Sequence, residues 1–252
     1  MSVIRVDITS TTLWATLDRP EAMNSVNFEV MAELEKIMDR IENEDGIRTF
    51  VFSGGGSKMF VSGGDLKEFH QLRTADEAGQ MSRRMHAILE RIETAPCWTI
   101  ACINGDAYGG GCEMMLAFDF RMASSEASFG FTQGRFYLPP GWGGLTRLVE
   151  QVGRSTALRW LAETAVIDAD TALTQKLIDR MAKQDELREK VLEWAAVLGK
   201  NDRDYIDVLK QGARRLGEAR RKAIAAELKP FCRFWEDERH HRRVQEFLNR
   251  KV

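Results

Sequence analysis

The sequence predicts an α/β fold followed by a helical C-terminal region. Between residues 3 and 123, short segments rich in β-branched and apolar residues indicate strands, and segments with apolar residues at every third or fourth position indicate helices. Beyond Pro140 the pattern is nearly all helical, and charged helices dominate from about Asp185 onward. We therefore place an α/β core at residues 1–195 and a helical region at residues 196–252.

Strands and helices follow one another along the predicted core. Residues 3–9 and 12–17 are expected to form a hairpin around a Thr-rich turn, and Asn27 can cap a helix that ends near Gly46. Residues 97–103 are almost wholly apolar, which is typical of a strand covered on both faces. The remaining expected elements are strands at 48–53 and 118–123, a turn at 104–106, and helices from about 65 and at 76–93, 109–117, 205–216 and 218–228.

Composition indicates a globular protein and argues against several classes. The 252 residues include 36 basic and 38 acidic side chains, and the formal charge of −2 supplies no overall field that would attract nucleic acid or an anionic membrane. The four cysteines form no CxxC pair, so we expect reduced thiols. Neither a signal peptide nor an apolar run of about 20 residues is visible. We expect a cytoplasmic protein without membrane contact, or an organellar one whose transit peptide has been removed.

Two glycine-rich junctions between a strand and a helix are the informative features, at residues 60–66 (FVSGGDL) and 104–113 (NGDAYGGGCE). At each helix start the N–H groups have no intrahelical acceptor, and the missing side chains let a ligand approach. Two converging N–H groups could stabilise an enolate or a tetrahedral oxyanion. The alternative is that these glycines only let helices pack closely on strands. The dinucleotide, phosphate-loop and GxSxG patterns are all missing from the sequence.

The order of these motifs resembles the crotonase superfamily of enoyl-CoA hydratases and isomerases. The resemblance spans roughly residues 3–180 and is carried by Arg19-Pro20 with Asn24, FVSGGDL at 60–66, INGDAYGGGCEMMLAFDFRMAS at 103–124 and PPGWGGLTRL at 139–148. It implies a spiral of ββα units and a C-terminal helical region that packs trimers, often paired into hexamers. It also implies an acyl-CoA thioester substrate that itself carries coenzyme A, so no separate cofactor is expected.

The same resemblance assigns residues to an oxyanion hole and to a coenzyme A channel. The backbone N–H groups of Gly64 and Gly110 would bind the thioester oxygen. The channel would be lined by residues on and near the first junction, which are Lys58, Phe60, Gly64, Asp65, Leu66 and Lys67.

Glu113 and Gln133 decide which reaction is expected. Glu113 lies one helical turn after Gly110 and can reach the carbon beside the thioester. In the hydratases that the sequence resembles, a second glutamate shares the attacking water, but Gln133 stands at that position here. An amide can bind water but cannot accept its proton.

Decarboxylation requires only one acid, and parts of the sequence also resemble ethylmalonyl-CoA decarboxylase. We therefore expect an acyl-CoA lyase, with decarboxylation of a short branched malonyl-CoA slightly ahead of hydration of a short 2-enoyl-CoA. An RNA-binding or noncatalytic homologue is a further alternative. The RNA-binding alternative rests on basic residues in the C-terminal region, although acidic residues interleave with them, so a solvated ion-paired face is favoured and nucleic-acid binding is not expected.

Other side chains have weaker assignments. Trp142 and Phe131 are candidates for the acyl pocket, although aromatic residues are more often plain core, and Arg135 could pair with a substrate carboxylate. His70 is expected on a helix surface. His240 has the helical spacing of a metal pair with Glu236, but without a third ligand we expect no metal site.

Overall fold

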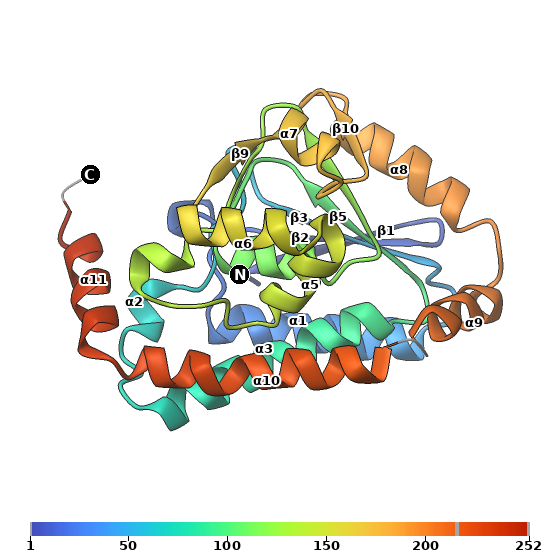
Figure 1. Cartoon of the computed structure of the whole chain (residues 1–252). Coiled ribbons are helices and arrows are strands. Elements are labelled where there is room, and N and C mark those ends of the chain that lie inside the picture. Colours follow the sequence, from blue (N-terminus) through green and yellow to red (C-terminus); the bar gives the residue numbers. More distant parts are fainter. Residues whose placement is uncertain (1, 215–216, 251–252) are drawn as a thin grey trace.

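A computed structural model describes residues 2–214 and 217–250, and two sheets form its centre (Figure 1). The larger sheet has the order β1 (Ile4–Thr9), β2 (Thr12–Leu17), β3 (Thr49–Gly54), β5 (Trp98–Ile103), β7 (Phe120–Ser124), β10 (Arg180–Ala182). The smaller sheet has the order β4 (Met59–Val61), β6 (Asp106–Tyr108), β8 (Ser128–Gly130), β9 (Val166–Asp168). β1 and β2 form the predicted antiparallel hairpin. The strands of the larger sheet from β2 onward, which are β2, β3, β5, β7 and β10, pair in parallel.

The chain builds these sheets as a spiral. β3 is followed by β4, β5 by β6 and β7 by β8, and in each pair the first strand joins the larger sheet and the second joins the smaller one. One or more helices follow each pair before the next turn begins, and β4, β6 and β8 lie parallel. The predicted α/β spiral of ββα units is therefore confirmed. Because successive turns stack in register, the loops that leave β4 and β6 lie at the same edge of the smaller sheet.

The helices of the spiral cover the sheets and bury the core. They are η1 (Pro20–Ala22), α1 (Phe28–Asn43), α2 (Leu66–Phe69), α3 (Ala75–Thr94), α4 (Gly110–Met115), η2 (Gln133–Phe136), α5 (Gly144–Val152), α6 (Arg154–Glu163) and α7 (Ala169–Thr174). Asn27 caps α1 as predicted, since its Oδ1 accepts from the Val30 N–H at 2.9 Å. β5 is buried on both faces, as expected: Ala101 faces the main core, and Ile100 faces a second cluster with Val191.

In the described part of the chain the last four helices are α8 (Leu187–Leu198), α9 (Arg203–Arg214), α10 (Glu218–Trp235) and α11 (Glu238–Leu248). The expected boundary at residues 195–196 lies inside α8, and α10 continues through Pro230, beyond its expected end at Leu228. Figure 1 shows α10 running beside α3, with α11 next to α2 at one end of the molecule. Two further expectations were wrong: Asp106 begins β6 rather than ending a turn, and the strands β9 and β10 interrupt the region expected to be helical.

Within the described ranges, no helix is both long enough and apolar enough to cross a membrane.

Candidate active site

The two glycine-rich junctions lie against each other. One connects β4 to α2 through Gly63 and Gly64, and the other connects β6 to α4 through Gly109. A Cβ atom built on Gly63 would lie 3.1 Å from the Gly110 nitrogen, so the first junction touches the start of α4. Gly63 has φ of 110° and Gly109 has φ of 51°, which side chains other than glycine rarely adopt. Both sharp turns therefore depend on glycine.

The N–H groups of Gly64 and Gly110 are available for an external acceptor. The Val26 N–H donates to the Gly63 carbonyl and the Asp65 N–H donates to the Val26 carbonyl, so the intervening Gly64 N–H faces away from Val26. Gly110 is the first residue of α4 and has no intrahelical acceptor. Within the described parts of the chain neither N–H has a hydrogen-bond partner, and both glycines are only half-buried. These are the properties that an oxyanion hole requires.

The indole of Trp142 packs against both glycines. A Cβ atom on Gly110 would lie 2.4 Å from Cζ3 of Trp142, and one on Gly64 would lie 3.6 Å from its Cζ2. The ring therefore touches the two junctions at once, and no side chain fits at residue 110. Trp142 is the one aromatic candidate for the acyl pocket that the described structure places beside both glycines.

Glu113 is buried in α4, with 2% of its surface exposed. Its Oε1 accepts from the Gln133 Nε2 at 3.0 Å and the Gly141 N–H at 3.2 Å, and its Oε2 accepts from the N–H groups of Trp142 at 2.7 Å and Gly144 at 2.9 Å. Burial raises the pKa of Glu113 above its ordinary value, although these hydrogen bonds act to lower it. Glu113 is thus a buried carboxyl group whose proton affinity is increased.

Gln133 completes this arrangement from the start of η2, and only 8% of its surface is exposed. Because an ionised Glu113 can only accept hydrogen bonds, the Gln133 amide nitrogen faces it. The other amide atom, Oε1, is buried and has no hydrogen-bond partner among the described residues. The sequence predicted that Gln133 and Glu113 share one site, and the structure brings them into direct contact.

A second buried carboxylate binds the start of α5, where Gly144 donates to Glu113. It was not predicted from the sequence. Glu227, from α10, accepts from the N–H groups of Leu145 at 3.1 Å and Thr146 at 2.7 Å, which follow directly after Gly144. Its negative charge also raises the pKa of Glu113. No local motif indicates this role, because residue 227 is far from residues 113 and 144 in the sequence.

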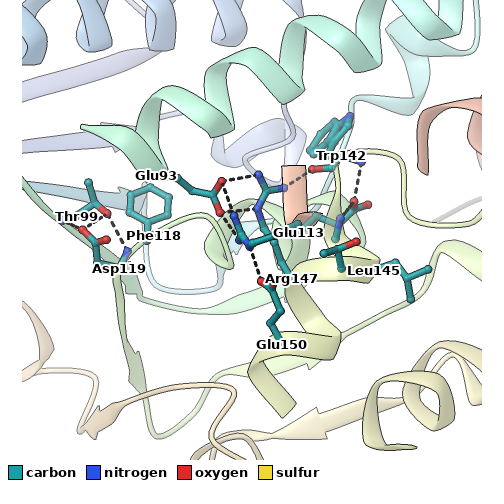
Figure 2. Close-up of polar contacts among 12 residues, drawn as sticks. Glu93, Thr99, Glu113, Phe118, Asp119, Trp142, Leu145, Arg147 and Glu150 are labelled. Atoms are coloured by element: carbon teal, nitrogen blue, oxygen red, sulfur yellow. Dashed lines mark hydrogen bonds and ion pairs between the residues drawn. The ribbon is translucent and has the colours of Figure 1, made fainter. Parts of the chain in front are cut away.

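A buried arginine supports the segment that contacts Glu113. The Arg147 guanidinium donates to the Trp142 carbonyl at 2.8 Å and pairs with Glu93 at 2.9 and 3.0 Å. Figure 2 shows Arg147 between these two groups, with the Trp142 N–H directed to Glu113. Beyond this network, between α3, α9 and α10, lies a cavity of about 820 Å³ whose lining includes Arg220 but neither Gly64 nor Gly110.

The residues expected to line a coenzyme A channel differ in their surroundings. The side chains of Lys58 and Lys67 are exposed, and Leu66 is half-buried. The carboxylate of Asp65 is engaged within the protein: it caps α2 through the Lys67 N–H at 3.1 Å and pairs with Arg19 at 2.9 Å. Phe60 has no exposed surface and packs edge-on against Phe52, which places its side chain in the core instead.

Two other pocket candidates lie elsewhere. Phe131 is buried and stacks on Trp160, with 5.8 Å between ring centroids, so it belongs to the hydrophobic core, as the alternative to an acyl pocket expected. Arg135 is exposed and donates to the Thr164 carbonyl at 3.3 Å, and in the described structure nothing connects it to Glu113.

The histidine candidates have protein partners. His240 is buried and its Nδ1 bonds to the Phe136 carbonyl at 2.8 Å, while His70 contacts Gln245. The part of the chain that the structure covers contains no group of three potential metal ligands.

Comparison with known proteins assigns the family. A family model described as enoyl-CoA hydratase/isomerase matches residues 7–252. The chain belongs to this enzyme family. It is 32% identical over 202 residues to a short-chain-enoyl-CoA hydratase of Clostridium acetobutylicum, covering 79% of this chain and 76% of the relative. It is also 32% identical over 177 residues to a crotonyl-CoA hydratase of Syntrophomonas wolfei, covering 69% of this chain and 67% of that one.

Solved structures of the family agree with the fold. The enoyl-CoA hydratase from Bacillus anthracis has a TM-score of 0.81 at 28% identity and covers 93% of this chain and 90% of its own. The enoyl-CoA hydratase from Bacillus halodurans has a TM-score of 0.90 at 24% identity and covers 97% and 100%. The predicted resemblance to the crotonase superfamily is therefore confirmed.

Proposed function

We propose that this enzyme adds water to the double bond of a short-chain 2-enoyl-CoA. The observation that carries the proposal is Gln133 Oε1, a buried acceptor without a hydrogen-bond partner among the described residues, on the same amide whose nitrogen donates to the Glu113 carboxylate at 3.0 Å. Such a pair suits a water molecule, which can donate one hydrogen to each oxygen. Two relatives support the same reaction, since one is a short-chain-enoyl-CoA hydratase and the other a crotonyl-CoA hydratase. Hydration is therefore better supported than the decarboxylation that the sequence alone favoured.

The reaction then needs one carboxylate and one amide. Coenzyme A enters as part of the substrate, and the Gly64 and Gly110 N–H groups bind the thioester oxygen. Water bound to Gln133 Oε1 attacks the β-carbon, and the electrons of the double bond move to form an enolate on that oxygen. Glu113 takes one proton from the water and returns it to the α-carbon, so the enzyme ends in its starting state.

The contact with Gly141, at 3.2 Å, is the longest of the four hydrogen bonds to Glu113. We propose that this hydrogen bond breaks when water binds to Glu113 Oε1, because the three shorter bonds hold the carboxylate more strongly.

Decarboxylation of a branched malonyl-CoA is the second candidate, because the described site contains one carboxyl group with a raised pKa. Loss of carbon dioxide leaves the electron pair of the broken bond on the α-carbon and thioester oxygen as an enolate. Protonated Glu113 would then supply the proton to the α-carbon.

One assay separates the two reactions. Purified enzyme in heavy water is given crotonyl-, methylmalonyl- and ethylmalonyl-CoA together, and the thioesters are analysed by mass spectrometry. We expect crotonyl-CoA to gain one heavy water. Carbon dioxide loss from a malonyl thioester without any gain on crotonyl-CoA would replace hydration with decarboxylation, and no change in any thioester would contradict both.

We also propose that the C-terminal region joins copies of the chain into a trimer or hexamer. α9 presents three large apolar side chains to solvent in the single chain, those of Tyr205, Val208 and Leu209, of which Val208 is 66% exposed. Light scattering coupled to size-exclusion chromatography tests this assembly, and Val208→Glu is expected to reduce the measured mass to that of one chain. An unchanged mass would place the contact elsewhere.

RNA binding has less support. Several basic side chains of α10 and α11 are paired with carboxylates, for example Arg220 with Glu93 at 2.7 Å and Arg239 with Asp237 at 2.7 Å. Pairing of this kind leaves fewer charges for phosphate groups. We expect no gel shift of RNA at low salt.

A further inference from the structure

The geometry points to Arg243 and His240, on the C-terminal helix α11, as positioning residues that hold η2 so that Gln133 stays in place on Glu113. This inference rests on the proposed function, because it assigns a role in hydration to a helix outside the spiral. Neither side chain contacts Glu113. Both act through the backbone of the turn that begins with Gln133.

The turn itself is short and carries much of the site. η2 contains four residues, and its hydrogen bonds include one from the Arg135 N–H to the Thr132 carbonyl and the closing contacts from the Tyr137 and Leu138 N–H groups to carbonyls at its start. A single turn of this kind has poor hydrogen-bond geometry and needs outside support. Any rotation of the turn would move the Gln133 amide away from Glu113, because the side chain leaves from its first residue.

Helix α11 supplies this support at two carbonyl groups. The Arg243 guanidinium donates to the Gly134 carbonyl at 2.9 Å, and the His240 Nδ1 bonds to the Phe136 carbonyl at 2.8 Å. Phe247 adds an edge-on contact with the Phe136 ring at 5.4 Å. Helix α11 thus holds the backbone of the residues that follow Gln133, through hydrogen bonds to two of their carbonyl oxygens.

His240 is suited to this task because it stays neutral. Only 1% of its surface is exposed, and its ring lies 4.7 Å from Trp235 and 5.1 Å from His241 between centroids. Burial lowers the pKa of His240 to about 4. Since a carbonyl can only accept, the Nδ1 atom carries the proton and donates.

Arg243→Ala is the principal test, with Arg242→Ala as the matched control. Both substitutions remove one arginine from adjacent positions of α11, but Arg242 is exposed and its nearest carboxylate, Glu246, is 4.0 Å away. We expect Arg243→Ala to lower kcat for crotonyl-CoA hydration about tenfold, since small displacements of a catalytic group are costly. KM should change by less than about twofold, because the residues expected to bind coenzyme A are unaltered. Arg242→Ala should match the wild type.

A double-mutant cycle shows whether Arg243 acts through Gln133. In a Gln133→Ala background, Arg243→Ala should reduce kcat by less than about twofold, because the amide that it positions is gone. Arg243→Lys should recover part of the lost kcat in the otherwise unaltered enzyme, since an ammonium group can still donate to a carbonyl. An equal loss in both backgrounds, or an unchanged kcat in Arg243→Ala, would overturn the inference.

Hydrogen–deuterium exchange tests the inference without depending on catalysis. The Tyr137 and Leu138 amides close η2, and their peptide should exchange faster in Arg243→Ala than in the wild type, while Arg242→Ala leaves it unchanged. Equal exchange in all three proteins would contradict the positioning role. Wild-type enzyme that fails to hydrate crotonyl-CoA would instead contradict the proposed function, and the exchange result would still decide the structural part of the inference.

His240 provides an independent check at the second carbonyl. His240→Asn keeps a donor near the position of Nδ1, whereas His240→Leu keeps an apolar side chain and removes the donor. We expect kcat to fall more in His240→Leu than in His240→Asn, with far-ultraviolet circular dichroism the same in both. The reverse order would overturn the role given to the His240 hydrogen bond.

Discussion

Glu113→Gln is expected to lower stability as well as remove turnover, although the two side chains have the same shape. The carboxylate accepts four hydrogen bonds from N–H groups, whereas an amide offers one oxygen and would direct its own NH2 group at the remaining donors. Two of the four donors therefore lose their acceptor. A buried donor without a partner costs about 1–3 kcal/mol, so the lost hydrogen bonds lower the free energy of unfolding by about 2–6 kcal/mol, and relief from burying a charge offsets part of this loss.

The pH dependence of this loss has a defined direction. Burial raises the pKa of Glu113 in the folded state above its ordinary value of 4.5. The contribution of the group to stability is therefore greatest below that ordinary pKa and declines as the pH rises through the folded-state value. The difference in stability between the wild type and Glu113→Gln should shrink over the same interval, because the amide does not titrate.

Urea unfolding followed by tryptophan fluorescence, at several pH values, measures both effects. Turnover of crotonyl-CoA is measured on the same preparations and should fall by at least about a hundredfold when the proton acceptor is lost. Glu150→Gln is the matched control, since Glu150 lies on α5 and pairs with Arg220 at a partly exposed position. A Glu113→Gln variant as stable as the wild type would show that the four hydrogen bonds do not hold this part of the site together.

Three further substitutions test other parts of the site. Gln133→Glu places a second carboxylate about 3 Å from Glu113, where repulsion is about 5 kcal/mol at an effective dielectric constant of 20. The free energy of unfolding in urea should therefore fall more steeply with pH than in the wild type, and parallel curves would refute this. Gly110→Ala forces its new methyl group into Trp142, so kcat should drop about tenfold or more, and wild-type kinetics would contradict the site. Arg147→Met breaks a buried ion pair and should cost about 3 kcal/mol in thermal or urea unfolding, whereas an unchanged midpoint would show that the pair contributes little.

Much of the spiral could be predicted because its longer strands carry their own signal. β2 and β5 each have six residues, and their apolar pattern gave nearly the observed bounds. β9 and β10 have three residues each, too few to show an alternation, and they form because distant strands offer free backbone groups. The sequence pattern therefore predicted every described strand of the larger sheet except β10, and none of the strands of the smaller sheet.

The residues of the candidate site also differ in whether the sequence could predict them. Gly64, Gly110 and Glu113 lie on local strand-to-helix junctions, where the residue types alone indicate free N–H groups and a nearby carboxylate. Glu227 and Arg243 act from helices more than 80 residues further along the chain, and their partners are backbone groups that any residue could supply. Reasoning from the sequence assigned this helical region to contacts between chains, because nothing local indicates that it also supports the site within one chain.

The amide at residue 133 changes how the proton affinity of the site is controlled. Two carboxylates in this position would repel each other and share a proton, so each would set the pKa of the other. With Gln133 in contact, Glu113 instead receives a hydrogen bond that favours its charged form, while burial and the charge of Glu227 favour its protonated form. The balance therefore depends on α10, which brings Glu227 to the start of α5. A single carboxyl group can then alternate between accepting a proton from water and returning it to carbon without a second acid.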